Sequence, residues 1–148
     1  MDKEMALKDA TGTFERTLVT IEEAQKICNR VDSLLPQGWH SQFWRGDFLE
    51  FCPLYPHKAS SAEFRTVCDL VEKVTGRKLG RRASGTKGNP KLIASNHSNF
   101  GNDTWLTLWV ESRADDDCKI TYKRTWETKA IADENCLGAS RQNGVSNG

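Results

Sequence analysis

The residues best suited to bind an anion lie in one stretch, residues 73–102. This stretch contains seven lysines and arginines and no acid, whereas the whole chain of 148 residues has a formal net charge of only +1. Cations gathered in one part of a near-neutral protein can neutralise phosphates locally, so contact with a polyanion is the first hypothesis. The seven cations are Lys73, Arg77, Lys78, Arg81, Arg82, Lys87 and Lys91.

The glycines and cations of this stretch match no known phosphate-binding loop. There is no Gly-x4-Gly-Lys-Ser/Thr sequence, and Gly76 and Gly80 do not continue as a dinucleotide fingerprint. Small residues between the cations would still let the backbone approach phosphates closely. The alternative is a solvated hairpin whose charges keep an edge strand from aggregating, and the sequence leaves both open.

Trp105 and Trp109 form a second candidate site, in the strand-like segment 104–112. If the apolar residues between them face the core, the two indoles point to the opposite face. Segments 104–112 and 118–128 both alternate, and we expect them to pair as a hairpin with Val110 opposite Ile120.

In that register Lys119 lies opposite Glu111, and Lys119 and Lys123 flank the indoles. Tryptophans beside lysines can stack single-stranded nucleic acid. The alternatives for Trp105 and Trp109 are the core of a second layer or a dimer interface.

The sequence gives no positive case for an enzyme. His40, His57 and His97 lie far apart and belong to no HExxH or His-x-Thr/Ser arrangement. Cys52 and His57 are close in sequence but have no evident third partner. Asp115, Asp116 and Asp117 lack the spacing of a calcium loop, so we expect a solvated hairpin tip there. No catalytic residue, metal site or cofactor is predicted.

Five cysteines stand far apart and form no CxxC pair. Their odd number and spacing argue against a disulfide framework or a zinc knuckle, so we expect all five to be reduced. They are Cys28, Cys52, Cys68, Cys118 and Cys136.

Two amphipathic helices are predicted to position these candidates. The first begins at a capping box of Thr20 with Glu23 and ends before Pro36. The second covers Ser61–Thr75, with a capping box of Ser60 and Glu63 and a C-terminal cap at Gly76. Both apolar stripes are expected to bury against a sheet.

Two hairpins are predicted besides the one at Trp109. Residues 39–44 and 48–52 are aromatic-rich strands joined around Arg45-Gly46-Asp47, whose match to an adhesion tripeptide we treat as chance. In the basic stretch, residues 78–84 and 91–95 are candidate strands on either side of a turn at 85–90.

The element order predicts an α+β fold, with two helices packed on one face of a mostly antiparallel sheet in the order α-β-β-α-β-β-β-β. We expect an arm at 1–17, either frayed or packed as a strap, one domain at 18–132 and a disordered tail at 133–148. No secretion signal or long apolar run is present, so membrane association is not expected and a cytoplasmic location is the default.

The function expected from the sequence is that of a small non-enzymatic binding protein that contacts nucleic acid through its basic hairpin. The alternative is a protein-interaction module, an inhibitor or adaptor, whose basic stretch and aromatic hairpins meet an acidic protein surface. A small hydrolase is the least favoured class. The predicted binding residues are Arg77, Lys78, Arg81, Arg82, Lys87, Lys91, Trp105, Trp109, Lys119 and Lys123.

Overall fold

The computed structural model describes residues 20–97, 106–116, 118–124 and 128–138. The predicted arm at 1–17, Trp105 and residues 139–148 of the predicted tail lie outside these ranges. Within them, no helix is long and apolar enough to cross a membrane.

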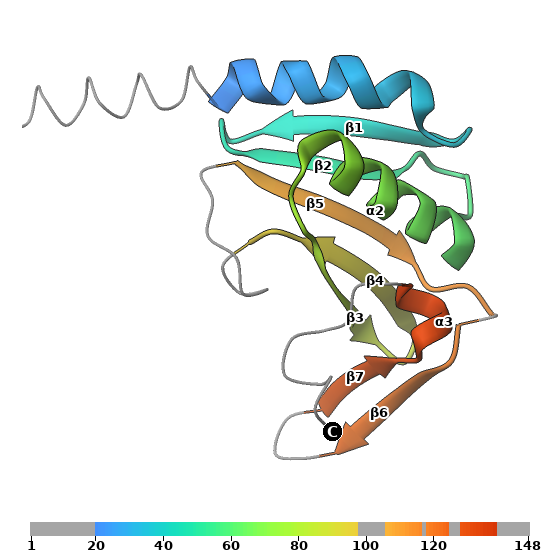
Figure 1. Cartoon of the computed structure of the whole chain (residues 1–148). Helices are drawn as coiled ribbons and strands as arrows, with labels where there is room; N and C mark the ends of the chain where they lie inside the picture. Colours follow the sequence, from blue (N-terminus) through green and yellow to red (C-terminus); the bar gives the residue numbers. More distant parts are fainter. Residues whose placement is uncertain (1–19, 98–105, 117, 125–127, 139–148) are drawn as a thin grey trace, which may run out of the picture.

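The described chain is an α+β fold, as predicted, with a five-stranded sheet and a separate two-stranded sheet (Figure 1). The large sheet has the order β1-β2-β5-β4-β3, and the small sheet consists of β6 and β7. Their bounds are β1 Trp39–Trp44, β2 Phe48–Pro53, β3 Gly80–Thr86, β4 Asn89–Ser95, β5 Thr107–Arg113, β6 Ile120–Arg124 and β7 Thr128–Ala132.

Helical segments cover residues 20–31, α2 Ser61–Thr75 and α3 Glu134–Leu137, and a short 3-10 turn, η1, covers Asp32–Leu34. The capping box of Ser60 with Glu63 is present at the start of α2, and Gly76 ends it at φ 70°. Thr20 is already helical and is therefore not an N-cap, which corrects the predicted start of the first helix.

Both predicted helices pack on the same face of the large sheet. Val31 from the first helix and Val67 and Val71 from α2 join one core with Leu49 of β2 and Leu108 of β5. Alternate residues of each strand therefore point to the other face of the sheet. We call this face the open face because no described helix covers it, although Ile93, Ser95 and Thr107 on it are buried.

The hairpins at β1–β2 and β3–β4 are confirmed, and both are antiparallel. The predicted hairpin of 104–112 with 118–128 is wrong. β5 lies between β2, to which it is parallel, and β4, to which it is antiparallel, while β6 pairs with β7. A central strand needs a partner on each edge, and alternation within one segment says nothing about which strands these are.

The C-terminal region also differs from its prediction. Residues of the expected tail form α3, which begins with Asp133 as its N-cap, and Cys136 of this helix forms a disulfide with Cys118. The expectation of five reduced cysteines is thus wrong for these two, whereas Cys28, Cys52 and Cys68 are free. A pair 18 residues apart matches no sequence signature, because the two approach only through the fold.

Candidate nucleic-acid interface

An aromatic row crosses the sheet face opposite the helices. Trp44 at the end of β1 lies opposite Phe48 at the start of β2, and their ring centroids are 5.0 Å apart. Phe48 in turn contacts Trp109 of β5 at 5.6 Å. The exposed fraction of Trp44 is 41%, and Phe48 and Trp109 are half-buried. Three rings from three neighbouring strands thus share one accessible surface.

The turn between β1 and β2 adds a cation to this row. Arg45 has φ of 60°, a left-handed conformation that costs a non-glycine residue about 1–2 kcal/mol. Its guanidinium carbon lies 4.9 Å from the centroid of the Trp44 ring. A cation over a partly exposed indole can contact a phosphate while the ring stacks on a base.

Cations from β3, β4 and β5 occupy the other half of the same face. Lys91 lies directly opposite Arg113, and the Arg113 side chain donates to the Gly88 carbonyl at 3.5 Å, at the tip of the β3–β4 hairpin. Arg82 lies opposite Ile93, two residues along β4 from Lys91. Like charges directly across a strand pair repel each other, and the Glu111 carboxylate, which pairs with the Lys91 ammonium, offsets part of this repulsion.

Glu111 joins the aromatic half to the cationic half. Its carboxylate accepts from the indole nitrogen of Trp109 at 3.2 Å and pairs with the Lys91 ammonium at 3.6 Å. Glu50 also lies on this face, opposite Trp109 in the parallel pairing. The surface is therefore mixed in charge at its centre, with its cations toward the β3–β4 tip and at Arg45.

Cys52 and His40 form a polar pair at the end of this face. A cysteine beside a histidine can be a catalytic pair when the thiol is activated. Cys52 lies opposite His40, with its sulfur 3.9 Å from the imidazole nitrogens. Burial raises the pKa of the Cys52 thiol to about 12, and the nearby Glu50 and Glu111 carboxylates add to this. The ring nitrogens of His40 contact the Cys52 carbonyl and the Gln42 amide. The raised pKa favours the thiol form of Cys52 over the reactive thiolate.

His57 and Cys52 are close in sequence, but His57 contacts a different residue in the structure. Its Nε2 contacts a Glu63 oxygen at 2.8 Å, at the start of α2. Across the described residues no group of three or more His, Cys, Asp or Glu side chains could hold a metal ion.

The structure separates the predicted binding residues into several environments. Arg81 has an exposed fraction of 1% and is enclosed by Asp69, Glu72 and the Leu137 carbonyl, so its predicted polyanion contact is wrong. Arg77 pairs with Glu23 of the first helix, away from the open face. Lys78 and Lys87 are exposed, the first before β3 and the second in the β3–β4 turn.

Lys119 and Lys123 do not flank the indole of Trp109. They belong to the region of β6, which pairs with β7 and not with β5. The residues that the sequence reasoning missed are Trp44, Phe48, Arg45 and Arg113. The orientation of Phe48 could have been predicted from the alternation of its strand. Leu49 and Phe51 face the core, so Phe48 must face away from it.

In comparisons with protein-family models, with curated proteins and with solved structures, no match to this chain was found.

Proposed function

We propose that this protein binds single-stranded nucleic acid on the open face of its five-stranded sheet. The observation that carries the proposal is the row of Trp44, Phe48 and Trp109, accessible on one face and continued by the cations of the β3–β4 hairpin. Bases would stack on the rings, and the backbone would follow Arg45 at one end and Lys91 with Arg113 at the other.

Single strands fit this surface better than a duplex does. The bases of a duplex are stacked on one another and cannot reach aromatic rings, whereas unpaired bases expose their faces. Mixed charge at the centre of the face also favours stacking there over phosphate contact. The cations serve as positioning groups, so we expect affinity without strong base preference.

Fluorescence anisotropy with a short labelled oligothymidylate at low salt tests the proposal. Trp44→Ala should raise Kd about 5- to 150-fold, because one base–aromatic stack contributes about 1–3 kcal/mol. Lys73→Ala is the matched control, since Lys73 is exposed in the last turn of α2 on the helical side. Absence of binding to single-stranded DNA and RNA at low salt would refute the proposal.

Removal of the two facing cations gives a second readout. The double variant Lys91→Ala/Arg113→Ala should make the dependence of log K on log salt shallower, by about 0.7 for each phosphate that is no longer neutralised. Affinity should fall by the same factor for oligonucleotides of different sequence.

A protein partner is the second candidate, favoured by the loop after β2. Tyr55 is 97% exposed and its neighbour Leu54 is 49% exposed, an arrangement typical of an interface anchor. Tyr55→Ala should leave nucleic-acid binding unchanged. If this variant, and not Trp44→Ala, abolishes recovery of one partner after nuclease treatment, the protein-partner hypothesis is the correct one.

The nucleic-acid proposal goes with a cytoplasmic location. A disulfide is typical of oxidising compartments, so in the cytoplasm Cys118–Cys136 would be exposed to exchange with thiols.

A further inference from the structure

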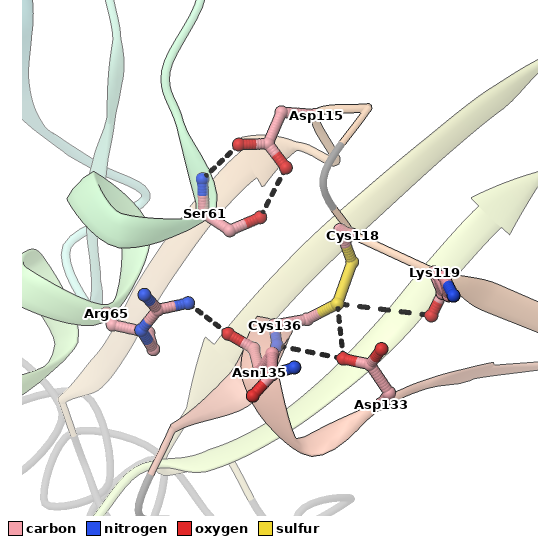
Figure 2. Close-up of a disulfide and its surroundings, with 8 residues drawn as sticks. All are labelled: Ser61, Arg65, Asp115, Cys118, Lys119, Asp133, Asn135 and Cys136. Carbon is pink, nitrogen blue, oxygen red and sulfur yellow. Dashed lines mark hydrogen bonds between the residues drawn. A yellow bond between two sulfur atoms is a disulfide. The ribbon is translucent and has the colours of Figure 1, made fainter.

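A cavity of about 550 Å³ lies between the start of α2 and α3, away from the open sheet face. This volume is within the range of small-molecule sites. Its walls include Ser61 and Arg65 from α2, Asp115 from the loop after β5, and both disulfide cysteines (Figure 2). Glu134 of α3 also lines it.

The two sulfur-bearing residues of this wall differ in accessibility. Cys136 has an exposed fraction of 0%, whereas Cys118 is half-buried. A thiolate attacks the disulfide sulfur that it can reach, along the axis of the S–S bond, and the other sulfur leaves. Both cysteines line the cavity, and Cys118 is the more accessible residue of the two. We therefore assign the Cys118 sulfur as the one attacked and the Cys136 sulfur as the leaving group.

The surroundings of Cys136 suit its reduced form as well as its oxidised form. Its Sγ lies 3.4 Å from an Asp133 carboxylate oxygen and 4.0 Å from the Lys119 carbonyl. A disulfide sulfur carries no hydrogen, so these are only contacts in the oxidised protein. Once released, the Cys136 thiol would find two acceptors in place, and no buried donor would be left unpaired.

Arg65 gives the cavity a preference for one kind of thiol. Its guanidinium lines the cavity and donates to the Asn135 carbonyl, which occupies only part of its five-donor set. The Asp115 carboxylate on the same wall accepts hydrogen bonds from the backbone N–H and the hydroxyl of Ser61, at 2.7 Å each. Glu134 is exposed at the rim. A carboxylate carried by the thiol therefore has Arg65 as its partner.

We propose that the cavity is a thiol-exchange site, at which a small carboxylate-bearing thiol forms a mixed disulfide with Cys118. The thiolate sulfur bonds to Cys118 Sγ, the Cys118–Cys136 bond breaks, and Cys136 leaves with the electron pair and takes up a proton. A second molecule of the thiol then releases Cys118 as a thiol and leaves as the symmetric disulfide. Reoxidation by that disulfide runs the same steps backwards.

The first test uses the wild-type protein with reduced glutathione, followed by acid quenching, alkylation and peptide mapping by mass spectrometry. The mixed disulfide should be found on Cys118. Free Cys28, Cys52 and Cys68 cannot form it with a reduced thiol alone, because that step needs a disulfide to break. Quenching at short reaction times keeps the released glutathione disulfide too dilute to modify them. Adducts on Cys136, or reaction only after unfolding in urea, would overturn the proposal.

A matched pair of variants tests which sulfur the cavity presents. Cys136→Ser leaves Cys118 as the thiol at the cavity, and Cys118→Ser leaves the buried Cys136. With oxidised glutathione, Cys136→Ser should form its adduct about tenfold faster or more, because thiol reactivity follows access. Equal rates, or a faster Cys118→Ser, would contradict the proposal. If neither variant folds, the wild-type mapping still decides.

The role of Arg65 is tested by comparing glutathione with cysteamine, which has no carboxylate, at equal thiolate concentration and low salt. Glutathione should react about two- to fivefold faster with the wild type, the gain expected of one partly exposed ion pair. Arg65→Gln should abolish this ratio and Arg65→Lys should restore it. A ratio unchanged in Arg65→Gln would show that no carboxylate is held there.

Discussion

Arg81 is one of the largest fully buried side chains in the described part of the protein. Its guanidinium reaches Asp69 and Glu72 of α2 and donates to the Leu137 carbonyl of α3 at 2.8 Å. Burial alone would lower the pKa of Arg81. Its interactions with Cys68, Asp69 and Glu72 raise the pKa by more than burial lowers it, so the guanidinium stays charged. The residue ties β3, α2 and α3 together.

We predict that Arg81→Ala destabilises the protein by about 3 kcal/mol in urea unfolding. Removing one partner of a buried ion pair costs about 3–5 kcal/mol, and the exposed Asp69, at 65%, places the cost at the low end. Lys87→Ala, in the exposed β3–β4 turn, is the control and should change stability by about 0.5 kcal/mol at most. Equal midpoints for the two variants would contradict a structural role for Arg81.

The position of Arg81 could have been predicted from its strand. It shares its parity with Leu79 and Ala83, which are both buried, so an alternating strand points it inward. Counting the cations in the stretch 73–102 did not predict this orientation, because net charge does not show which face of the strand each side chain is on. Trp109 was placed on the correct face by the same alternation, even though its strand partner was wrong.

At the scale of elements, local signals were reliable and long-range pairing was not. The capping box of Ser60 with Glu63 and the β1–β2 and β3–β4 hairpins depend on residues a few positions apart, and the structure contains all of them. The parallel pairing of Phe48 with Thr107 joins segments about 60 residues apart, for which one sequence holds no signal. The candidate interface was incomplete for this reason, because β5 brings Trp109 to Phe48 only through that pairing.

Two carboxylates, those of Glu63 and Asp115, accept hydrogen bonds at the start of α2. Glu63 closes the capping box and accepts from His57 and the Trp39 indole, while Asp115 accepts from the backbone and side chain of Ser61. Burial raises the pKa of each carboxyl, but these hydrogen bonds outweigh it and hold both below their ordinary values. Asp115 was expected to be a solvated tip, and instead it joins the loop after β5 to α2.

We predict that these two groups make the protein less stable in acid. A carboxyl with a lowered folded pKa adds stability that is complete above its unfolded pKa and is lost as pH falls through the folded value. The thermal midpoint should therefore fall as pH drops below about 4.5, the ordinary pKa of Glu63. Asp115→Asn should make this fall shallower, and Asp116→Asn, at an exposed neighbour, should not. Identical pH profiles for both variants would contradict the Asp115–Ser61 contact.

For the molecule as a whole, the large sheet separates stability from the proposed function. The helical face holds the core, and the open face holds the aromatic row. The β6–β7 hairpin with α3 is a smaller unit beside β3 (Figure 1). The Tyr122 hydroxyl donates to the Thr86 carbonyl at 3.1 Å, Arg81 donates to the Leu137 carbonyl, and Cys136 and Leu137 of α3 join the hydrophobic core.

The final prediction concerns how far this smaller unit depends on its disulfide. A two-stranded sheet and a four-residue helix are each marginal alone. Closing a loop over the 18-residue separation of Cys118 and Cys136 contributes about 3 kcal/mol in the chain-entropy model. Without it, β6, β7 and α3 should open locally before the five-stranded sheet does.

Hydrogen exchange read by mass spectrometry measures this directly in the double variant Cys118→Ser/Cys136→Ser. Destabilisation by about 3 kcal/mol corresponds to exchange about 100-fold faster in β6, β7 and α3, with little change in β2 and β5. Cys52→Ser, which removes a free thiol on the open face, is the control and should leave both regions unchanged. If exchange instead rises equally in both sheets, the unit is not separable and the disulfide stabilises the whole fold. If it rises in neither, contacts such as that of Arg81 with Leu137 suffice, and opening the disulfide by a thiol would leave α3 in place.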